Sequence, residues 1–176
     1  MTPKVVLIGP PGVGKSTVAR ELAYRLGVRV TDTDTRIEYL AAKPISDIFV
    51  DDGEDYFRDL EATTVAESLQ SEHGVVSLGG GAVMRPETQE LLTGYAAAGG
   101  CVVFLDVSLA HAVARVSLNQ ARPLLLGSPR AQWQSLMTQR RPIYERLATL
   151  TIQTDDKAPE DIALEILGTL WTEEAQ

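Results

Sequence analysis

A phosphate-binding loop is the clearest chemical signal in the sequence. Residues 9–16 read Gly-Pro-Pro-Gly-Val-Gly-Lys-Ser, which fits the spacing G-x-x-x-x-G-K-[ST], and Thr17 follows. The glycines of such a loop let successive backbone N–H groups point at one anion, and the helix that begins near Lys15 adds the positive end of its dipole. Lys15 is expected to reach the β- and γ-phosphates of a nucleotide, and the Ser16 hydroxyl to ligate Mg²⁺. The sequence therefore predicts a nucleoside triphosphate site.

Two further polar or glycine-rich segments follow predicted strands. Asp32 and Asp34 are two residues apart, so on an extended chain both carboxylates point beyond the carboxyl end of the strand, where ligands bind in open α/β sheets. One carboxylate can hold the Mg²⁺ shell while the other orients and deprotonates an acceptor hydroxyl; the alternative is an Asp N-cap of a helix that starts at Thr35. The glycines at 79–81 allow backbone amides to approach a ligand closely, or form no more than a flexible turn.

The elements that must position these groups alternate along the whole chain. Apolar runs predict strands at 4–8, 28–31, 75–78, 101–105 and 149–153. Helices are predicted at 15–26, 54–70, 107–117, 131–148 with an interruption at Pro142, and from Pro159 to about 171. This order predicts one α/β domain over residues 1–176, with a parallel sheet covered on both faces. Residues 119–130 show little periodicity and predict a loop long enough to close over a site.

Composition and charge exclude several classes of protein. The net charge of −8 argues against a nucleic-acid or anionic-membrane binder, and no apolar run approaches the roughly 20 residues that span a bilayer. The N-terminus lacks the pattern of a signal peptide, and Cys101 has no second cysteine to pair with, so we expect a cytoplasmic protein. Cys101 is predicted to be a small buried residue of a strand, and Trp133 and Trp171 to pack on helix faces.

Together these motifs resemble the shikimate kinase family. The resemblance covers about residues 4–155, and the matching pieces occur in the family's order: 9–17, 32–34, 47–49, 53–58 with Glu61, 77–82, 122–125 and 140–144. It implies a three-layer α/β/α fold with a five-stranded parallel sheet, of the nucleoside-monophosphate-kinase type. It also implies a substrate-binding helical region at about 33–61 and a lid at about 117–130. The activity implied is transfer of the γ-phosphate of ATP to the 3-hydroxyl of shikimate, in chorismate biosynthesis, by a monomer.

The resemblance also assigns roles to individual residues. Catalysis is expected from Asp34, Lys15 and the lid arginine Arg122. Shikimate is expected to contact Asp34, Arg58, Gly79, Gly80, Gly81 and Arg140, with Arg141 the alternative to Arg140. ATP is expected to contact Gly12, Val13, Gly14, Lys15, Ser16, Thr17, Arg115, Arg122 and Lys157, and Mg²⁺ to be held by Ser16 and Asp32. The pairing of Arg58 with Glu61, three residues on, would fix the guanidinium for a carboxylate.

Two departures from the family pattern and two rival functions accompany this assignment. Residues 94–100 form a longer stretch than the family usually has, which predicts an extended surface turn, and the expected adenine loop at 155–159 is acidic where relatives are often basic. A gluconate kinase should lack Arg58 and Arg140 together with the triple glycine. A non-catalytic nucleotide- or shikimate-sensing module would tend to lose Asp34 or Lys15.

Overall fold

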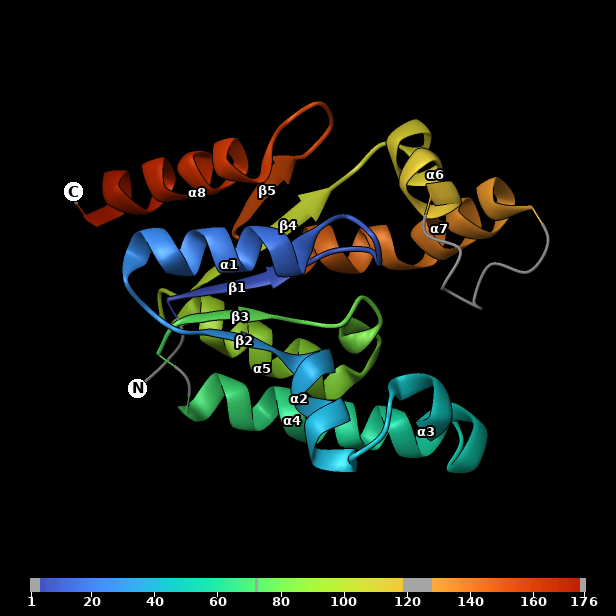
Figure 1. The fold of residues 1–176 in the computed structure, drawn as a ribbon. Helices are drawn as coiled ribbons and strands as arrows, with labels where there is room; N and C mark the ends of the chain where they lie inside the picture. The colour runs from blue at the N-terminus through green and yellow to red at the C-terminus, as the bar shows by residue number, and fades with distance from the viewer. Residues whose placement is uncertain (1–3, 72, 119–127, 175–176) are drawn as a thin grey trace.

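A five-stranded parallel sheet forms the centre of the protein (Figure 1). The computed structural model describes residues 4–71, 73–118 and 128–174. The strand order is β2-β3-β1-β4-β5, and every pairing is parallel. The strands are β1 (Val5–Ile8), β2 (Val30–Asp32), β3 (Val75–Ser77), β4 (Cys101–Asp106) and β5 (Leu150–Gln153). The predicted five-stranded parallel sheet is confirmed, with strand limits that differ by one or two residues.

Helices cover both faces of this sheet, as predicted. On one face α1 (Lys15–Leu26) packs against α8 (Pro159–Glu174). The other face carries α4 (Glu54–Ser71), α5 (Pro86–Ala97) and α7 (Pro129–Leu147). The short α2 (Thr33–Ala41) and α3 (Ile45–Asp51) pack on α4, and α6 (Leu109–Leu118) packs on α7. Across the described part of the chain, none of these helices is long and apolar enough to cross a membrane.

The central strand is apolar on both faces because helices cover both sides of it. Val5, Val6 and Leu7 are completely buried, and Cys101 at the start of β4 is buried as predicted. A parallel strand that is buried on both faces reads as a continuous apolar run rather than an alternating one. This packing fixes the end of β1, and the phosphate-binding loop begins directly after it.

A second, smaller apolar cluster lies where α2, α3 and α4 meet. Its buried members are Ile37, Ile48 and Phe57, one from each helix, and the Phe49 ring lies 4.8 Å from the Phe57 ring. Since each helix is short or carries charged residues on its outer side, this shared cluster is what holds the three together. It places the first turns of α4, and thus Arg58 and Glu61, beside the carboxyl end of β2.

The sequence-based prediction for α7 was wrong at both its start and its middle. The helix begins at Pro129, after Ser128 accepts a hydrogen bond from the Ala131 N–H, and it continues through Pro142 without a break. Proline is tolerated at the first helical position, but within a helix it removes one backbone hydrogen bond. Buried side chains before and after Pro142, Met137 and Tyr144, pack in the same core and outweigh that loss.

Two other predictions are wrong, the first of them for residues 94–97 of the expected turn at 94–100. Residues 94–97 belong to α5 rather than to a surface turn, because the helix continues through Gly94 as far as Ala97. Trp133 is 5% exposed, as predicted, but Trp171 is 61% exposed and lies near the end of the last helix. Residues 119–127, most of the expected lid at about 117–130, lie outside the described residues.

Two glycine substitutions test this description of the fold. An added Cβ at Gly74 would lie 1.7 Å from the Arg29 carbonyl oxygen, whereas at Gly94 it would meet nothing within 4 Å. Gly74→Ala should therefore destabilise the protein by about 3 kcal/mol or more, because backbone must move. Gly94→Ala should stabilise it by about 0.5–1 kcal/mol, because alanine favours a helix interior. Thermal and urea unfolding measure both, and a loss of stability in Gly94→Ala would contradict the helical assignment.

Candidate active site

The phosphate-binding loop is held in shape by its own lysine and by the neighbouring strand. The Lys15 ammonium donates to the carbonyl oxygens of Gly9 at 2.8 Å and Pro10 at 2.9 Å. Gly9 packs so tightly on β4 that an added Cβ would lie 2.5 Å from the Leu105 carbonyl oxygen. The loop runs directly into α1, whose first N–H groups face the same space. This geometry is that of an anion-binding loop at the N-terminus of a helix.

Asp32 makes two contacts, and one of them is a helix N-cap, although the capped helix starts two residues before the expected Thr35. Its Oδ2 accepts a 2.5 Å hydrogen bond from the Ser16 hydroxyl, and its Oδ1 accepts from the Thr35 N–H at 3.2 Å. The second contact makes Asp32 the N-cap of α2, which starts at Thr33. Asp34 consequently lies in the first helical turn and not on an extended strand, so the predicted reason for its direction was wrong. Both carboxylates nevertheless reach one cavity.

That cavity, about 290 Å³ in volume, joins the phosphate-binding loop to the ends of β2 and β3. It is lined by Pro11, Gly12, Gly14, Lys15, Ser16, Thr17, Asp32, Asp34, Ser77, Leu78 and Gly80. The lining unites the predicted nucleotide-binding residues with Asp34 and the glycine turn.

The start of α2, the glycine turn at 79–81 and the first turns of α4 meet in a region that we call the acceptor side. A buried carboxyl group, Glu61, lies within it. Glu61 is only 2% exposed, and its Oε2 accepts a 2.6 Å hydrogen bond from Arg58. Burial raises the pKa of the Glu61 carboxyl, Arg58 opposes that rise, Asp34 adds to it, and Arg140 opposes it. Thus Asp34, Arg58 and Arg140 all act on the same carboxyl, although they come from α2, α4 and α7. The structure brings together the three side chains on which the sequence argument depended.

The glycine turn after β3 lies against these groups so closely that no side chain fits. An added Cβ at Gly79 would lie 2.6 Å from Asp34 Oδ1 and 2.8 Å from Glu61 Oε1. At Gly81 it would lie 2.6 Å from an Arg58 guanidinium nitrogen. The turn is therefore a close backbone approach to the acceptor side rather than a flexible connection.

The adjacent arginines of α7 have different surroundings. Arg141 donates to Asp106 Oδ2 at 2.5 Å and lies over the Phe104 ring at 6.0 Å, at the end of β4. Arg140 instead acts electrostatically on the Glu61 carboxyl and on the Tyr144 hydroxyl. Consecutive residues of a helix point about 100° apart, so only one of the pair can face Glu61. The geometry favours Arg140.

The opposite side of the phosphate-binding loop carries α6 and the loop between β5 and α8. The Arg115 guanidinium donates to the Val13 carbonyl oxygen at 2.7 Å, which fixes this arginine on the outer side of the phosphate-binding loop. Lys157 pairs with Glu165 at 2.6 Å on the surface of α8. Arg122 lies outside the described residues. Arg115 thus lies against the phosphate-binding loop, and Lys157 lies in the loop after β5.

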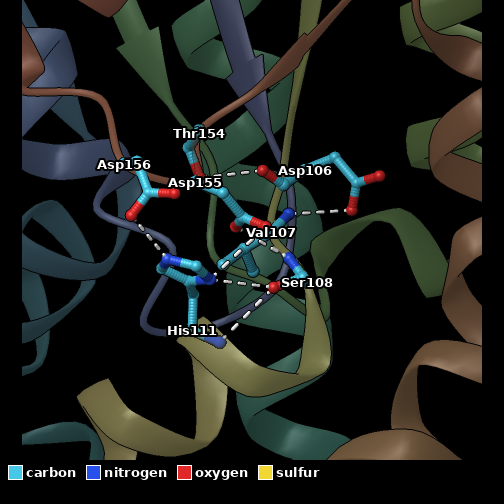
Figure 2. Close-up of polar contacts among 7 residues, drawn as sticks. All are labelled: Asp106, Val107, Ser108, His111, Thr154, Asp155 and Asp156. Carbon is cyan, nitrogen blue, oxygen red and sulfur yellow. Dashed lines mark hydrogen bonds and ion pairs between the residues drawn. The ribbon is translucent and has the colours of Figure 1, made fainter.

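The acidic β5–α8 loop is tied to the start of α6 (Figure 2). Asp155 accepts from the Ser108 N–H at 3.0 Å, and Asp156 Oδ1 lies 3.0 Å from His111 Nε2. Burial tends to raise the pKa of Asp155, but hydrogen bonds from Ser108, with Gln153 and His111 assisting, lower it below its usual value. The acidic residues at 155–156 therefore have a structural use, because they join two segments that flank the phosphate-binding loop.

Comparison with known proteins supports the family that the sequence motifs indicate. The family model described as shikimate kinase matches residues 11–171. A shikimate kinase of Thermobifida fusca is 53% identical over 161 residues, which are 92% of this chain and 91% of the relative. The solved shikimate kinase of Acinetobacter baumannii, in complex with shikimate, superposes with a TM-score of 0.91 at 32% identity over 100% of this chain and 96% of that chain.

The chain belongs to the shikimate kinase family. The predictions of family, fold and an ATP-dependent kinase are confirmed. A gluconokinase from Sinorhizobium meliloti 1021 superposes with a TM-score of only 0.62 at 18% identity, over 97% of this chain and 93% of that chain, which shows a shared fold alone. The gluconate-kinase and sensing-module alternatives are therefore set aside.

Two residues that hold the acceptor side were given no role from the sequence. The buried Thr33 hydroxyl contacts the Ser77 carbonyl oxygen at 3.3 Å and accepts from the Gly79 N–H at 3.2 Å, joining α2 to the glycine turn. Tyr144 donates to the Gly80 carbonyl oxygen at 2.5 Å. Thr33 stands between the two aspartates and Tyr144 ends a family motif, so their positions were visible. Their partners, 46 and 64 residues away along the chain, were not.

Glu61 gives the site a testable pH dependence. Since its pKa is raised, Glu61 should take up a proton at a higher pH than an ordinary glutamate, about 4.3, and Arg58 then loses its charged partner. The KM for the acceptor should therefore rise as the pH falls toward the raised pKa of Glu61. Glu61→Gln should raise the KM about tenfold at neutral pH and remove most of its acid-side rise.

Glu67→Gln is the matched control. Glu67 is on the same helix but pairs at 3.4 Å with Arg36 on the surface, so this variant should keep the wild-type profile. Steady-state kinetics between pH 5 and 9 measures both variants. An identical acid-side profile for Glu61→Gln and the wild type would contradict the role of this carboxyl.

Proposed function

We propose that the chain transfers the γ-phosphoryl group of ATP to the 3-hydroxyl of shikimate, giving shikimate 3-phosphate and ADP for chorismate and aromatic amino acid biosynthesis. The observation that supports this proposal best is the meeting of Asp34, Arg58 and Arg140 around buried Glu61, beside the phosphate-binding loop. The acceptor must carry one anionic group and hydroxyls near it. Shikimate, a ring with one carboxylate and three hydroxyls, fits that description.

Arg58 and Arg140 would bind the carboxylate of shikimate. A planar guanidinium forms paired hydrogen bonds with a carboxylate, so two arginines give both affinity and orientation. Glu61 holds Arg58 from behind at 2.6 Å, which reduces the conformational freedom that binding would otherwise remove. The backbone of Gly79, Gly80 and Gly81 would contact the ring from the side that no Cβ occupies.

Asp34 would accept the proton of the attacking hydroxyl. It lies in the same cavity as Lys15 and Ser16, between the acceptor side and the phosphates. A carboxylate at that position both orients the hydroxyl and takes its proton as the oxygen attacks phosphorus. As the new oxygen–phosphorus bond forms, the bond between the γ-phosphorus and the bridging oxygen of ADP breaks. ADP then leaves, and Asp34 would pass the proton to solvent.

Charge on the transferring group would be stabilised mainly by cations and backbone amides that are already in position. Lys15 and the N-terminus of α1 face the loop, and Arg122, outside the described residues, is proposed as the lid arginine. The backbone of Gly12, Val13 and Gly14, with Thr17, would hold the phosphates. Arg115 and Lys157 are proposed to contact the nucleoside, because both lie on the β4–β5 side of the loop.

Ser16 and Asp32 suit a magnesium ion. Their oxygens lie 2.5 Å apart at the edge of the cavity, and a hydroxyl with a carboxylate is a hard oxygen set of the kind that Mg²⁺ prefers. Mg²⁺ usually keeps several waters and takes further oxygens from the phosphates, so two protein groups suffice. When bound, the ion neutralises phosphate charge. Asp32 would act through water.

We also propose a cytoplasmic monomer that acts on small molecules. The net charge of −8 disfavours nucleic acid and anionic membranes as partners. A single, buried cysteine is consistent with a reducing compartment.

An acceptor survey tests the reaction. ADP release with Mg-ATP is measured with shikimate, quinate, gluconate and nucleoside monophosphates, and the expected result is efficient turnover of shikimate only. The other compounds present their hydroxyls or their anionic group in a different arrangement. They should be poor substrates, because buried polar groups left unpaired weaken binding strongly. Turnover of gluconate without turnover of shikimate would contradict the proposal, and analysis of the product by NMR identifies the hydroxyl.

Alanine substitution of the two neighbouring arginines tests the carboxylate site. Arg140→Ala should raise the KM for shikimate about 10- to 100-fold, because a hydrogen bond to a charged group contributes about 1.5–3 kcal/mol, while the KM for ATP stays near wild type. Arg141→Ala is the control, since Arg141 pairs with Asp106, and its shikimate KM should change less than threefold. The reverse order of effects would assign the carboxylate to Arg141.

A further inference from the structure

Tyr144 of α7 is fully buried, and its side chain contacts β4 and the glycine turn at 79–81. It lies one helical turn after Arg140, and its ring stacks on Phe104 of β4 with the ring centres 5.0 Å apart. Its hydroxyl donates to the Gly80 carbonyl oxygen at 2.5 Å, across 64 residues of sequence. The side chain therefore spans from a helix through the core to the glycine turn.

The hydroxyl has two partners, and both belong to the acceptor side. It donates a hydrogen bond to the Gly80 carbonyl oxygen, and the Arg140 guanidinium, one helical turn earlier, acts on it electrostatically. Burial raises the pKa of Tyr144 to about 12, although Arg140 and Arg58 act against the rise. The phenol therefore stays protonated, and remains a donor, over the whole range in which the enzyme can be assayed.

Gly80 is held from its other side by the phosphate-binding loop. An added Cβ at Gly80 would lie 2.7 Å from Pro11 Cδ and 2.9 Å from Pro11 N. The contacts thus form one continuous path, from Arg140 to Tyr144, then to Gly80 and Pro11. The central step is a hydrogen bond from a fully buried hydroxyl, and Gly80 packs closely on Pro11, so a shift of Tyr144 would be passed on to the glycine turn.

We infer that Tyr144 is a positioning residue, which sets the Arg140 guanidinium and the Gly80 peptide relative to the phosphate-binding loop. This inference rests on the proposed function, because it assigns Arg140 to the carboxylate of the acceptor. The distance from that carboxylate to the phosphates decides whether the hydroxyl reaches the γ-phosphorus in line. Small errors in such a distance reduce the rate strongly. Tyr144 acts on the acceptor through Arg140 and Gly80, without touching it.

Tyr144→Phe tests the inference with little change in packing. The ring and its stacking on Phe104 remain, while Gly80 loses a hydrogen bond and Arg140 loses the polar group that it acts on. The expected result is an increase of about fivefold to tenfold in the KM for shikimate with a lower kcat, while the KM for ATP stays within about twofold. Titration of shikimate without ATP, followed by calorimetry, should show a matching loss of affinity.

Tyr95→Phe is the matched control for stability. Tyr95 is also buried, burial raises its pKa to about 12 as well, and its hydroxyl bonds backbone at Cys101, at the opposite end of β4. Both variants should lower the melting temperature by a similar few degrees, but only Tyr144→Phe should change shikimate kinetics. A merely structural role for Tyr144 predicts the same kinetics for both variants.

The outcomes separate this inference from the proposed function. A wild-type protein that does not turn over shikimate would contradict the proposed function. A wild type that does, together with a Tyr144→Phe variant whose shikimate KM and affinity are unchanged, would overturn the inference alone. Equal increases in the KM values for shikimate and ATP would also overturn it, since they indicate general loosening of the site.

Discussion

A buried carboxyl group organises the acceptor side of this protein. Glu61 lies out of reach of solvent, and an isolated charge in such a place costs several kcal/mol unless cations and hydrogen bonds compensate it. Arg58 meets that need directly at 2.6 Å, and Arg140 contributes from another helix. The two guanidinium groups thus act on one carboxyl group, although they come from different helices. Removing the carboxyl would leave two like charges with no reason to remain together.

The order of strands places different groups on the two sides of the phosphate-binding loop. The phosphate-binding loop follows β1, in the middle of the sheet, and β3 and β4 lie on either side of it. The β2–β3 side supplies Asp32, Asp34 and the glycine turn, whereas the β4–β5 side supplies α6 and the acidic loop. Ligands of open α/β sheets bind at the carboxyl ends of the strands, and here one loop lies between both of them. With the proposed substrates, the acceptor and the nucleoside would therefore meet only at the phosphates.

Predictions from local sequence signals agreed with the structure better than predictions of helix limits. Local signals were reliable for the phosphate-binding loop, for the buried strands and for Cys101, because each depends on neighbours in sequence. Helix limits were less reliable. Pro142 was expected to interrupt α7, but buried Met137 and Tyr144 keep the helix continuous, and Gly94 was expected in a turn but lies within α5. In both cases tertiary packing outweighed local propensity.

Residue types and their spacing were enough to identify the chemistry: a glycine-rich loop with its lysine and serine, two carboxylates after the second strand, and arginines suited to an anionic acceptor. How these groups combine depends on the folded chain. It placed Arg140 rather than Arg141 toward Glu61, gave Asp32 both a cap and a contact with Ser16, and tied Tyr144 to Gly80. The reason is physical: residue type and spacing fix what a side chain can do, but its partners come from distant segments that meet only when the core packs.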